Sequence, residues 1–264
     1  MGGLIEALAI GLAVGVVIGA LGAGGGILSI PILVYLLGQT PHSAAASSLV
    51  IVGVTALTSL PHRVRKRHVD WGAGFMFGGF SIVGTFAGSR LSALVSGRVL
   101  MILFAVLLAS VSVLMARRGL ALRRWEATGS APGGASDEAP RIRWGRVAVT
   151  ATATGLLTGF FGLGGGFIMV PVLVFALGLG MRKAAGTSLV AMTVTTVSAL
   201  ASRLGTPVTI DWPLTLLFAL GSAFGGMLGG PLSQRARSST LTLIFAGLLA
   251  VVAAFTLAQN LLFA

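Results

Sequence analysis

The chain has 264 residues, of which 55% are hydrophobic and only 9% are charged, and its mean hydropathy is +0.99. In soluble domains about a quarter of the residues are charged, so this composition excludes a soluble globular protein. The continuous apolar runs exclude an outer-membrane β-barrel. The net charge of +12 comes from basic residues that lie between apolar segments without interleaved aromatic residues, a pattern that sets membrane topology and excludes nucleic-acid binding.

The first half of the chain predicts five apolar helical segments, at residues 4–21, 26–38, 43–60, 71–89 and 98–116. Runs near 20 residues can cross roughly 30 Å of hydrocarbon. A single helix from residue 4 to residue 37 would be about 51 Å long, too long for one crossing. The glycine run that ends at Gly26 also disfavours helix by on the order of 1 kcal/mol per glycine. We therefore expect a helix break at this run, followed by a shorter helix.

A polar stretch separates the two halves of the chain. It is rich in Gly, Ala, Pro, Ser and charged residues, which predicts a flexible linker. The expected organisation is a first transmembrane repeat at 1–116, a cytoplasmic linker at 117–145 and a second transmembrane repeat at 146–264.

The second half repeats the first at an offset of 140 residues. GAGGGILSIPILVYLLG, from Gly22, returns as GLGGGFIMVPVLVFALG, from Gly162, and roughly 17 of the 39 aligned pairs from residue 22 to residue 60 are identical. Each copy carries a glycine-rich break inside apolar sequence, which is typical of transporters built from two repeats. The apolar segments of this half are 146–161, 166–180, 184–201, 212–230 and 239–263.

The basic residues distinguish two topologies. Ten helical segments, five in each half, give two inverted repeats with both termini outside and leave only Arg90, Arg98 and Arg203 outside. Eight crossings give parallel repeats, which bring Arg203 inside and place four other basic residues of the second half outside: Arg182, Lys183, Arg235 and Arg237. We therefore expect an all-α, multi-pass protein of the bacterial inner (cytoplasmic) membrane with ten segments and helix breaks at the glycine motifs. Eight crossings remain the alternative.

The glycine motifs are the first candidate binding elements. Glycine lets the backbone approach a ligand closely, and a helix N-terminus offers unpaired N–H groups and partial positive charge to an anion. Two inverted repeats would aim two such ends at one midplane cavity, whereas close helix packing is the alternative role of small residues. The candidate substrate-binding glycines are Gly24, Gly25, Gly26, Gly164, Gly165 and Gly166.

Hydroxyl side chains follow each glycine motif at matched positions. Ser47 and Ser48 in the first half correspond to Thr187 and Ser188 in the second, and hydroxyl groups can donate to an oxyanion. The alternative is a hydroxyl that bonds back to its own helix or joins two helices. These four residues complete the predicted binding site.

Two aspartates each precede a tryptophan at the start of a predicted helix. We expect Asp70 and Asp211 to cap these helices, with the tryptophans as interfacial anchors. The three histidines, His42, His62 and His68, fall in predicted loops without metal-ligand spacing. No metal or cofactor is expected.

The GxGGG run followed by proline, together with AxGTSL, resembles the sulfite exporter TauE/SafE family. The better match is GLGGGFIMVPVLVFALGLGMRKAAGTSLV in the second half, whereas the first half has ASS in place of GTS. The resemblance covers essentially the whole chain. It implies movement of small sulfur-containing or carboxylate anions, such as sulfite, sulfonates or sulfoacetate, across the cytoplasmic membrane.

The sequence therefore predicts a secondary transporter that exports such anions by alternating access. A passive anion channel and a structural or assembly membrane protein are the alternatives. An enzyme is not expected, because the chain has no cysteine, no histidine within an apolar segment and no phosphate-binding loop. The expected partners are the anion and the lipid bilayer; proton or sodium coupling and a homodimer stay open.

Overall fold

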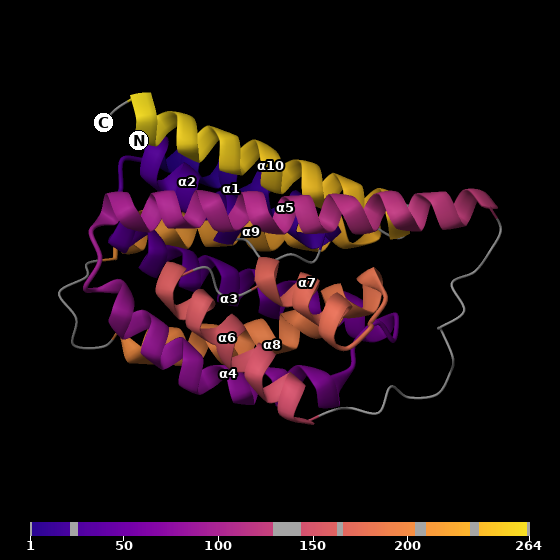
Figure 1. Cartoon of the computed structure of the whole chain (residues 1–264). Helices are drawn as coiled ribbons and strands as arrows, with labels where there is room; N and C mark the ends of the chain where they lie inside the picture. The colour runs from indigo at the N-terminus through magenta and orange to yellow at the C-terminus, as the bar shows by residue number, and fades with distance from the viewer. Residues whose placement is uncertain are drawn as a thin grey trace.

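The computed structural model describes residues 2–21, 26–128, 144–162, 166–203, 210–232 and 238–262. These residues form ten α-helices and no strand (Figure 1), which confirms the all-α class. The first half contains α1 (Gly2–Leu21), α2 (Gly26–Tyr35), α3 (Pro41–Arg65), α4 (Trp71–Ser92) and α5 (Gly97–Thr128). The second half contains α6 (Trp144–Phe161), α7 (Gly166–Ala176), α8 (Met181–Ser202), α9 (Trp212–Leu232) and α10 (Ser238–Leu262).

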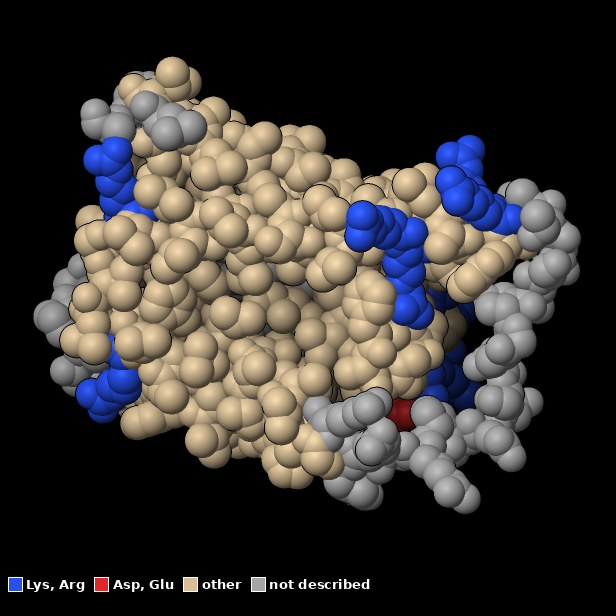
Figure 2. Space-filling view, in the orientation of Figure 1, with Lys and Arg blue, Asp and Glu red and all other residues tan. Residues whose placement is uncertain are grey.

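The surface of the molecule fits a lipid environment. In the described residues, five helices are long and apolar enough to cross a membrane: α3, α5, α8, α9 and α10. Figure 2 shows Lys and Arg side chains towards two ends of one face, with a broad uncharged surface between them. Large hydrophobic side chains such as Val83, Phe224 and Val251 are exposed. Exposing this broad apolar surface to water would be unfavourable, so it faces lipid. The chain is therefore a multi-pass membrane protein.

The two short helices α2 and α7 end in the same way. Gly38 and Gly178 follow them with φ angles of +66° and +67°, a left-handed conformation that glycine adopts without a steric penalty. The residue after each glycine donates its N–H back to the helix, at 2.8 Å in α2 and 3.3 Å in α7. This hydrogen bond satisfies a carbonyl that the helix end would leave unpaired.

The first helix of each half packs against the fourth helix of the other half. A Cβ at Gly15 of α1 would lie 2.2 Å from the carbonyl oxygen of Ser222 in α9. At the matching place, a Cβ at Gly155 of α6 would lie 2.1 Å from the carbonyl oxygen of Ser81 in α4. The backbones of each pair are therefore in direct contact, as small residues allow in membranes. The two halves make equivalent contacts through equivalent residues.

The long helices α5 and α10 pack side by side and run in opposite directions (Figure 1). The Ser112 hydroxyl donates to the Ala246 carbonyl at 2.8 Å, and the Ser239 hydroxyl donates to the Glu126 carboxylate at 2.6 Å. The contact nearer the end of α5 is therefore the contact nearer the start of α10. The last helices of the two halves are antiparallel.

Two helices, α3 and α5, end well beyond their predicted segments. α5 continues to Thr128, so residues 117–128 are helical, contrary to the expected linker; Leu, Arg, Ala and Glu in this stretch favour helix. The remaining linker residues 129–143 lie outside the described part of the chain. α3 begins at Pro41 and ends at Arg65, so His42 and His62 lie in a helix and not in loops. The predicted boundaries followed apolar residues alone, whereas the helix is started by the Thr40 cap.

The glycine contacts give a first prediction. Replacing Gly15 or Gly155 by Ala is expected to lower the free energy of unfolding by about 1–3 kcal/mol, because the added Cβ overlaps a carbonyl oxygen of the facing helix. Thermal unfolding of the purified protein in detergent measures the effect.

The matched control is Gly79→Ala in α4, where an added Cβ meets nothing within 4 Å. That variant should melt at the wild-type temperature or above it, since alanine favours helix over glycine. Equal melting temperatures for all three variants would contradict the close packing.

Candidate functional site

The glycine motifs lie at the junctions α1–α2 and α6–α7. α1 ends at Leu21 and α2 begins at Gly26, while α6 ends at Phe161 and α7 begins at Gly166. Two predicted site residues, Gly26 and Gly166, are therefore the first residues of their helices, where backbone N–H groups have no partner within the helix. The other predicted glycines lie outside the described residues: Gly24, Gly25, Gly164 and Gly165.

The start of the second motif is held by α3 of the first half. Gly162 has a φ of +70°, and a Cβ there would lie 2.5 Å from the carbonyl oxygen of Ala45. The Ser48 hydroxyl donates to the Gly162 carbonyl and lies 3.0 Å from the Ala45 carbonyl. Ser48 therefore fixes the position where α6 ends, and Gly162 is required there both by its backbone conformation and by the space available.

The four predicted hydroxyl residues are all fully buried, and they make different contacts. The Ser188 hydroxyl lies 3.0 Å from the Ala185 carbonyl, as its counterpart Ser48 does from Ala45. The Thr187 hydroxyl accepts a hydrogen bond from the Asp70 N–H at 3.0 Å. Among the four, only the Ser47 hydroxyl lacks a partner in the described residues. A buried hydroxyl without a partner costs about 1–3 kcal/mol, so Ser47 is the one whose contact a ligand would complete.

The two hydroxyl pairs lie at different levels of the molecule. Thr187 contacts Asp70 at the start of α4. Ser89, near the end of α4, donates to the Gly159 carbonyl at 3.4 Å, close to the motif that Ser48 contacts. These two places are roughly 28 Å apart along α4, at 1.5 Å per residue. The structure does not bring the two pairs together at one point.

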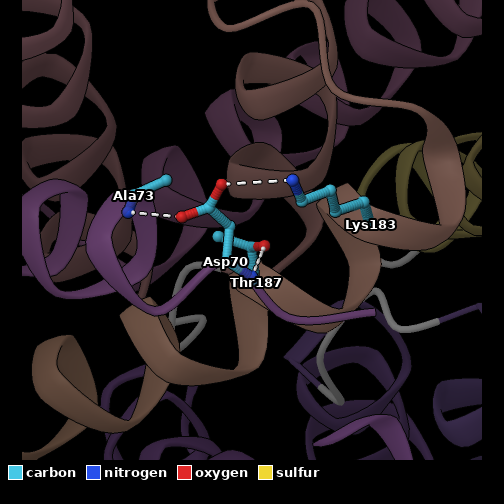
Figure 3. A network of polar contacts seen from close by, with 4 residues as sticks. All are labelled: Asp70, Ala73, Lys183 and Thr187. Atoms are coloured by element: carbon cyan, nitrogen blue, oxygen red, sulfur yellow. Dashed lines mark hydrogen bonds and ion pairs between the residues drawn. The ribbon is translucent and has the colours of Figure 1, made fainter. Parts of the chain in front are cut away.

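Asp70 joins the two halves at the start of α4 (Figure 3). Its Oδ1 accepts a hydrogen bond from the Ala73 N–H at 3.1 Å, which confirms the predicted helix cap. Its Oδ2 lies 3.3 Å from Nζ of Lys183, at the start of α8. Asp211 caps α9 in the same manner, with its Oδ1 accepting from the Leu214 N–H at 3.2 Å.

The ion pair shows which segments share an end of the molecule. Lys183 and Asp70 are in contact, so the start of α8 lies at the same end as the loop that follows α3. The sequence did not identify Lys183 as a partner of Asp70, because the first half has Ser43 at the matching position. No signal from the repeat could have found it.

Sequence analysis also missed Arg63, which lies between the predicted apolar segments 43–60 and 71–89. Arg63 is 4% exposed and donates to the Gly19 carbonyl at 2.9 Å. The available signal was its spacing from Arg203, which equals the 140-residue offset of the glycine motifs.

Metal ligation and one surface groove were the remaining candidates among the described residues. In the part of the chain that the structure describes, no group of three or more His, Asp or Glu side chains is placed to hold a metal ion. A groove of about 600 Å³ lies between the start of α6 and the end of α7, and none of the predicted site residues lines it; its lining is Gly145, Val149, Thr150, Phe175 and Ala176.

Comparison with known proteins gives one family and several transporter relatives. The family model described as "Sulfite exporter TauE/SafE" matches residues 7–256. A "Probable membrane transporter protein" of Xylella fastidiosa (strain 9a5c) is 34% identical over 241 residues, covering 89% of this chain and 87% of the relative. "Probable membrane transporter protein YunE" of Bacillus subtilis is 27% identical over 253 residues, covering 89% and 90%. No solved structure matches the chain significantly.

The hydroxyl contacts predict that substitutions at Ser48 and at Ser47 have different effects on the free energy of unfolding. Replacing Ser48 by Ala should lower the free energy of unfolding by about 1 kcal/mol, because the Gly162 carbonyl loses its donor. Replacing Ser47 by Ala should leave it unchanged or slightly raised, since that hydroxyl has no partner in the described residues. Thermal unfolding in detergent decides, and equal losses for both variants would show that Ser47 has a structural partner.

The two aspartate caps provide a second matched pair of variants. Asp211→Ala removes a cap, with an expected loss of about 0.5–2 kcal/mol. Asp70→Ala removes a cap and the Lys183 ion pair, and should cost about 0.2–1 kcal/mol more, the usual value of an exposed pair. Lys183→Met should reproduce this additional loss in wild-type protein and have no effect in the Asp70→Ala background. Additive losses in the double variant would refute the coupling.

Proposed function

Since this chain belongs to the sulfite exporter TauE/SafE family, we propose that it is a secondary transporter of small sulfur-containing or organic anions, such as sulfite, sulfonates or sulfoacetate. The relatives named as probable membrane transporter proteins support transport in the wider sense. The single observation that carries the anion specificity is the pair of matched helix starts at Gly26 and Gly166. Helix N-termini in a membrane attract anions without a charged side chain.

The two halves are inverted repeats in this proposal. The antiparallel arrangement of α5 and α10, which are equivalent helices, supports it. The basic loop after α3 and the start of α8 share one end of the molecule, and an excess of basic residues marks the cytoplasmic side. Inverted repeats allow alternating access, because one half can exchange its conformation with the other.

The anion is bound by backbone N–H groups of the first turns of α2 and α7 and by Ser47. Ser48, Thr187 and Ser188 lie against the backbone: Ser48 holds the end of α6, Thr187 contacts the start of α4, and Ser188 lies against its own helix. Their contacts support a role in holding the helix ends that border the path. Because the structure does not bring the two hydroxyl pairs together at one point, the anion meets the two breaks in succession in this mechanism.

The membrane potential favours export. A negative interior contributes roughly 2.3 kcal/mol per charge per 100 mV to the outward movement of an uncoupled anion. The Asp70–Lys183 ion pair lies at the basic end and is partly exposed. In this mechanism, the pair separates each time the cytoplasmic end opens.

Counterflow in proteoliposomes tests the proposal. Vesicles preloaded with unlabelled sulfite, methanesulfonate or acetate receive the same labelled anion outside. Uptake that rises with the internal anion identifies a carrier, whereas uptake without such stimulation indicates a passive channel. No uptake of any of the three anions would refute anion transport and favour a structural role.

The binding role of Ser47 is measured in the same vesicles. Ser47→Ala should raise KM about tenfold, as expected for a lost hydrogen bond to a charged group, while its melting temperature stays at the wild-type value. A KM equal to that of the wild type would remove Ser47 from the site.

A further inference from the structure

Three fully buried hydroxyl groups on three different helices have no hydrogen-bond partner among the described residues. They belong to Ser29 of α2, Ser47 of α3 and Thr215 of α9. A common partner of a buried hydroxyl in a helix is the carbonyl three or four residues before it, as Thr55 shows by donating to Ile51 at 2.7 Å. Leaving a buried hydroxyl without any partner is costly. Each of the three is therefore a donor that a ligand could use.

Ser29 and Ser47 lie on the faces through which α2 and α3 meet. Leu33 of α2 and Ala44 and Ile51 of α3 belong to one buried apolar cluster. Ser29 precedes Leu33 by four residues. Ser47 lies three residues after Ala44 and four residues before Ile51. Residues at these spacings share one face of a helix, so both serines face the contact between the two helices.

The two serines also lie at the same depth. α2 continues for six residues after Ser29, to Tyr35, and α3 begins six residues before Ser47, at Pro41. The two helices pack against each other after a short connection, so each serine lies about 9 Å from that connection at 1.5 Å per residue. Ser29 is in the first turn of α2. Because side chains of a helix tilt towards its N-terminus, the Ser29 hydroxyl lies on the side of the free N–H groups of this turn.

Thr215 of α9 belongs to the same place. It precedes Phe218 by three residues, and Phe218 is a member of the same apolar cluster. Its counterpart in the second half is Gly74 of α4, since each stands four residues after the capping aspartate. A Cβ at Gly74 would lie 3.2 Å from the carbonyl oxygen of Thr187, which is the counterpart of Ser47. Because the two halves make equivalent contacts, Thr215 lies beside Ser47.

The second half does not repeat this set of donors. Met169 stands in place of Ser29, and Gly74 stands in place of Thr215. The third hydroxyl, on Thr187, already has a partner, because it accepts the Asp70 N–H at 3.0 Å. The two halves therefore share the helix break but differ in the side chains beside it. Of these matched positions, only those of the first half carry buried hydroxyls without partners.

Three hydroxyl donors suit an anionic group with three oxygens. Hydroxyls on three helices can each donate to a different oxygen of one bound sulfite or sulfonate group. A carboxylate has only two oxygens and would leave one of the donors without a separate acceptor. Hydrogen bonds to an ionised acceptor are roughly twice as strong as neutral ones, and the start of α2 adds partial positive charge. Such a site attracts an anion without burying a cation when it is empty.

We infer that Ser29, Ser47 and Thr215, together with the first turn of α2, form the main anion-binding site of this protein. The ligand class is a small anion that carries a three-oxygen group. The inference rests on the proposed anion transport and deepens it, because it adds Ser29 and Thr215 to the site and makes the two halves unequal. The break before α2 binds the anion tightly, and the break before α7 binds it more weakly.

Calorimetric titration of the detergent-purified protein with methanesulfonate tests the inference. Ser29→Ala and Thr215→Val each remove one donor and should raise Kd about tenfold, as expected for a lost hydrogen bond to a charged group. Without ligand, both variants should melt at the wild-type temperature or above it, since neither hydroxyl has a partner to lose in the described residues. A Kd at the wild-type value in both variants would overturn the inference.

The matched control is Ser59→Ala. Ser59 is also a buried serine of α3 without a partner in the described residues, but it lies twelve residues, or about 18 Å, along the helix from Ser47. Its removal should leave Kd unchanged. A tenfold rise in this variant as well would show a general effect of lost hydroxyl groups and would overturn the assignment.

A second ligand tests the number of donors. Acetate has two oxygens, so wild-type protein should bind it about tenfold more weakly than methanesulfonate. Thr215→Val should narrow this difference, because its loss weakens the binding of the three-oxygen group more. Equal affinities of the wild type for the two anions would overturn the three-donor site.

Binding and transport together distinguish this inference from the proposed function. If the wild type binds methanesulfonate and the variants lose affinity, but no anion moves in proteoliposomes, the transport proposal fails and the site stands. If the wild type transports the anion and Ser29→Ala and Thr215→Val keep both its Kd and its KM, the site fails and transport stands. A wild type that neither binds nor moves the anion would refute both.

Discussion

The structure depends on backbone contact between helices of opposite halves. Gly15 of α1 lies against Ser222 of α9, and Gly155 of α6 lies against Ser81 of α4, at distances that leave no room for a methyl group. In lipid the hydrophobic effect does not draw helices together, so close packing of small residues has to do so. Each first helix, which precedes a glycine motif, is therefore packed against the fourth helix of the other half.

Polar groups inside the bundle follow from the same constraint. A helix that ends at membrane depth leaves carbonyl groups without partners, and water cannot supply them there. Ser48 donates to the Gly162 carbonyl, while Arg63 and Arg203 donate to the carbonyls of Gly19 and Gly159. The glycines near each break thus have hydrogen-bond donors from the other helices on their carbonyl groups.

The two ends of the molecule are related but not identical. Asp70 and Asp211 cap equivalent helices, yet Asp70 also pairs with Lys183, which has Ser43 as its counterpart. A duplicated fold supplies the exchange of conformations that alternating access needs. Specificity for a substrate can then change through a few side chains without altering the helix packing.

The sequence alone determined the membrane class, the ten helices and the two aspartate caps, because each depends on composition or on neighbours within a few residues. It also showed the repeat, as a similarity at a fixed offset along the chain. Only the tertiary structure decided that Ser48 bonds a backbone carbonyl while Ser47 does not, and that Lys183 pairs with Asp70. It also decided that Arg63 is buried although the basic residues that follow it, Arg65, Lys66 and Arg67, are exposed. Each of these outcomes is set by a partner far away along the chain, and such a partner leaves no local pattern to read.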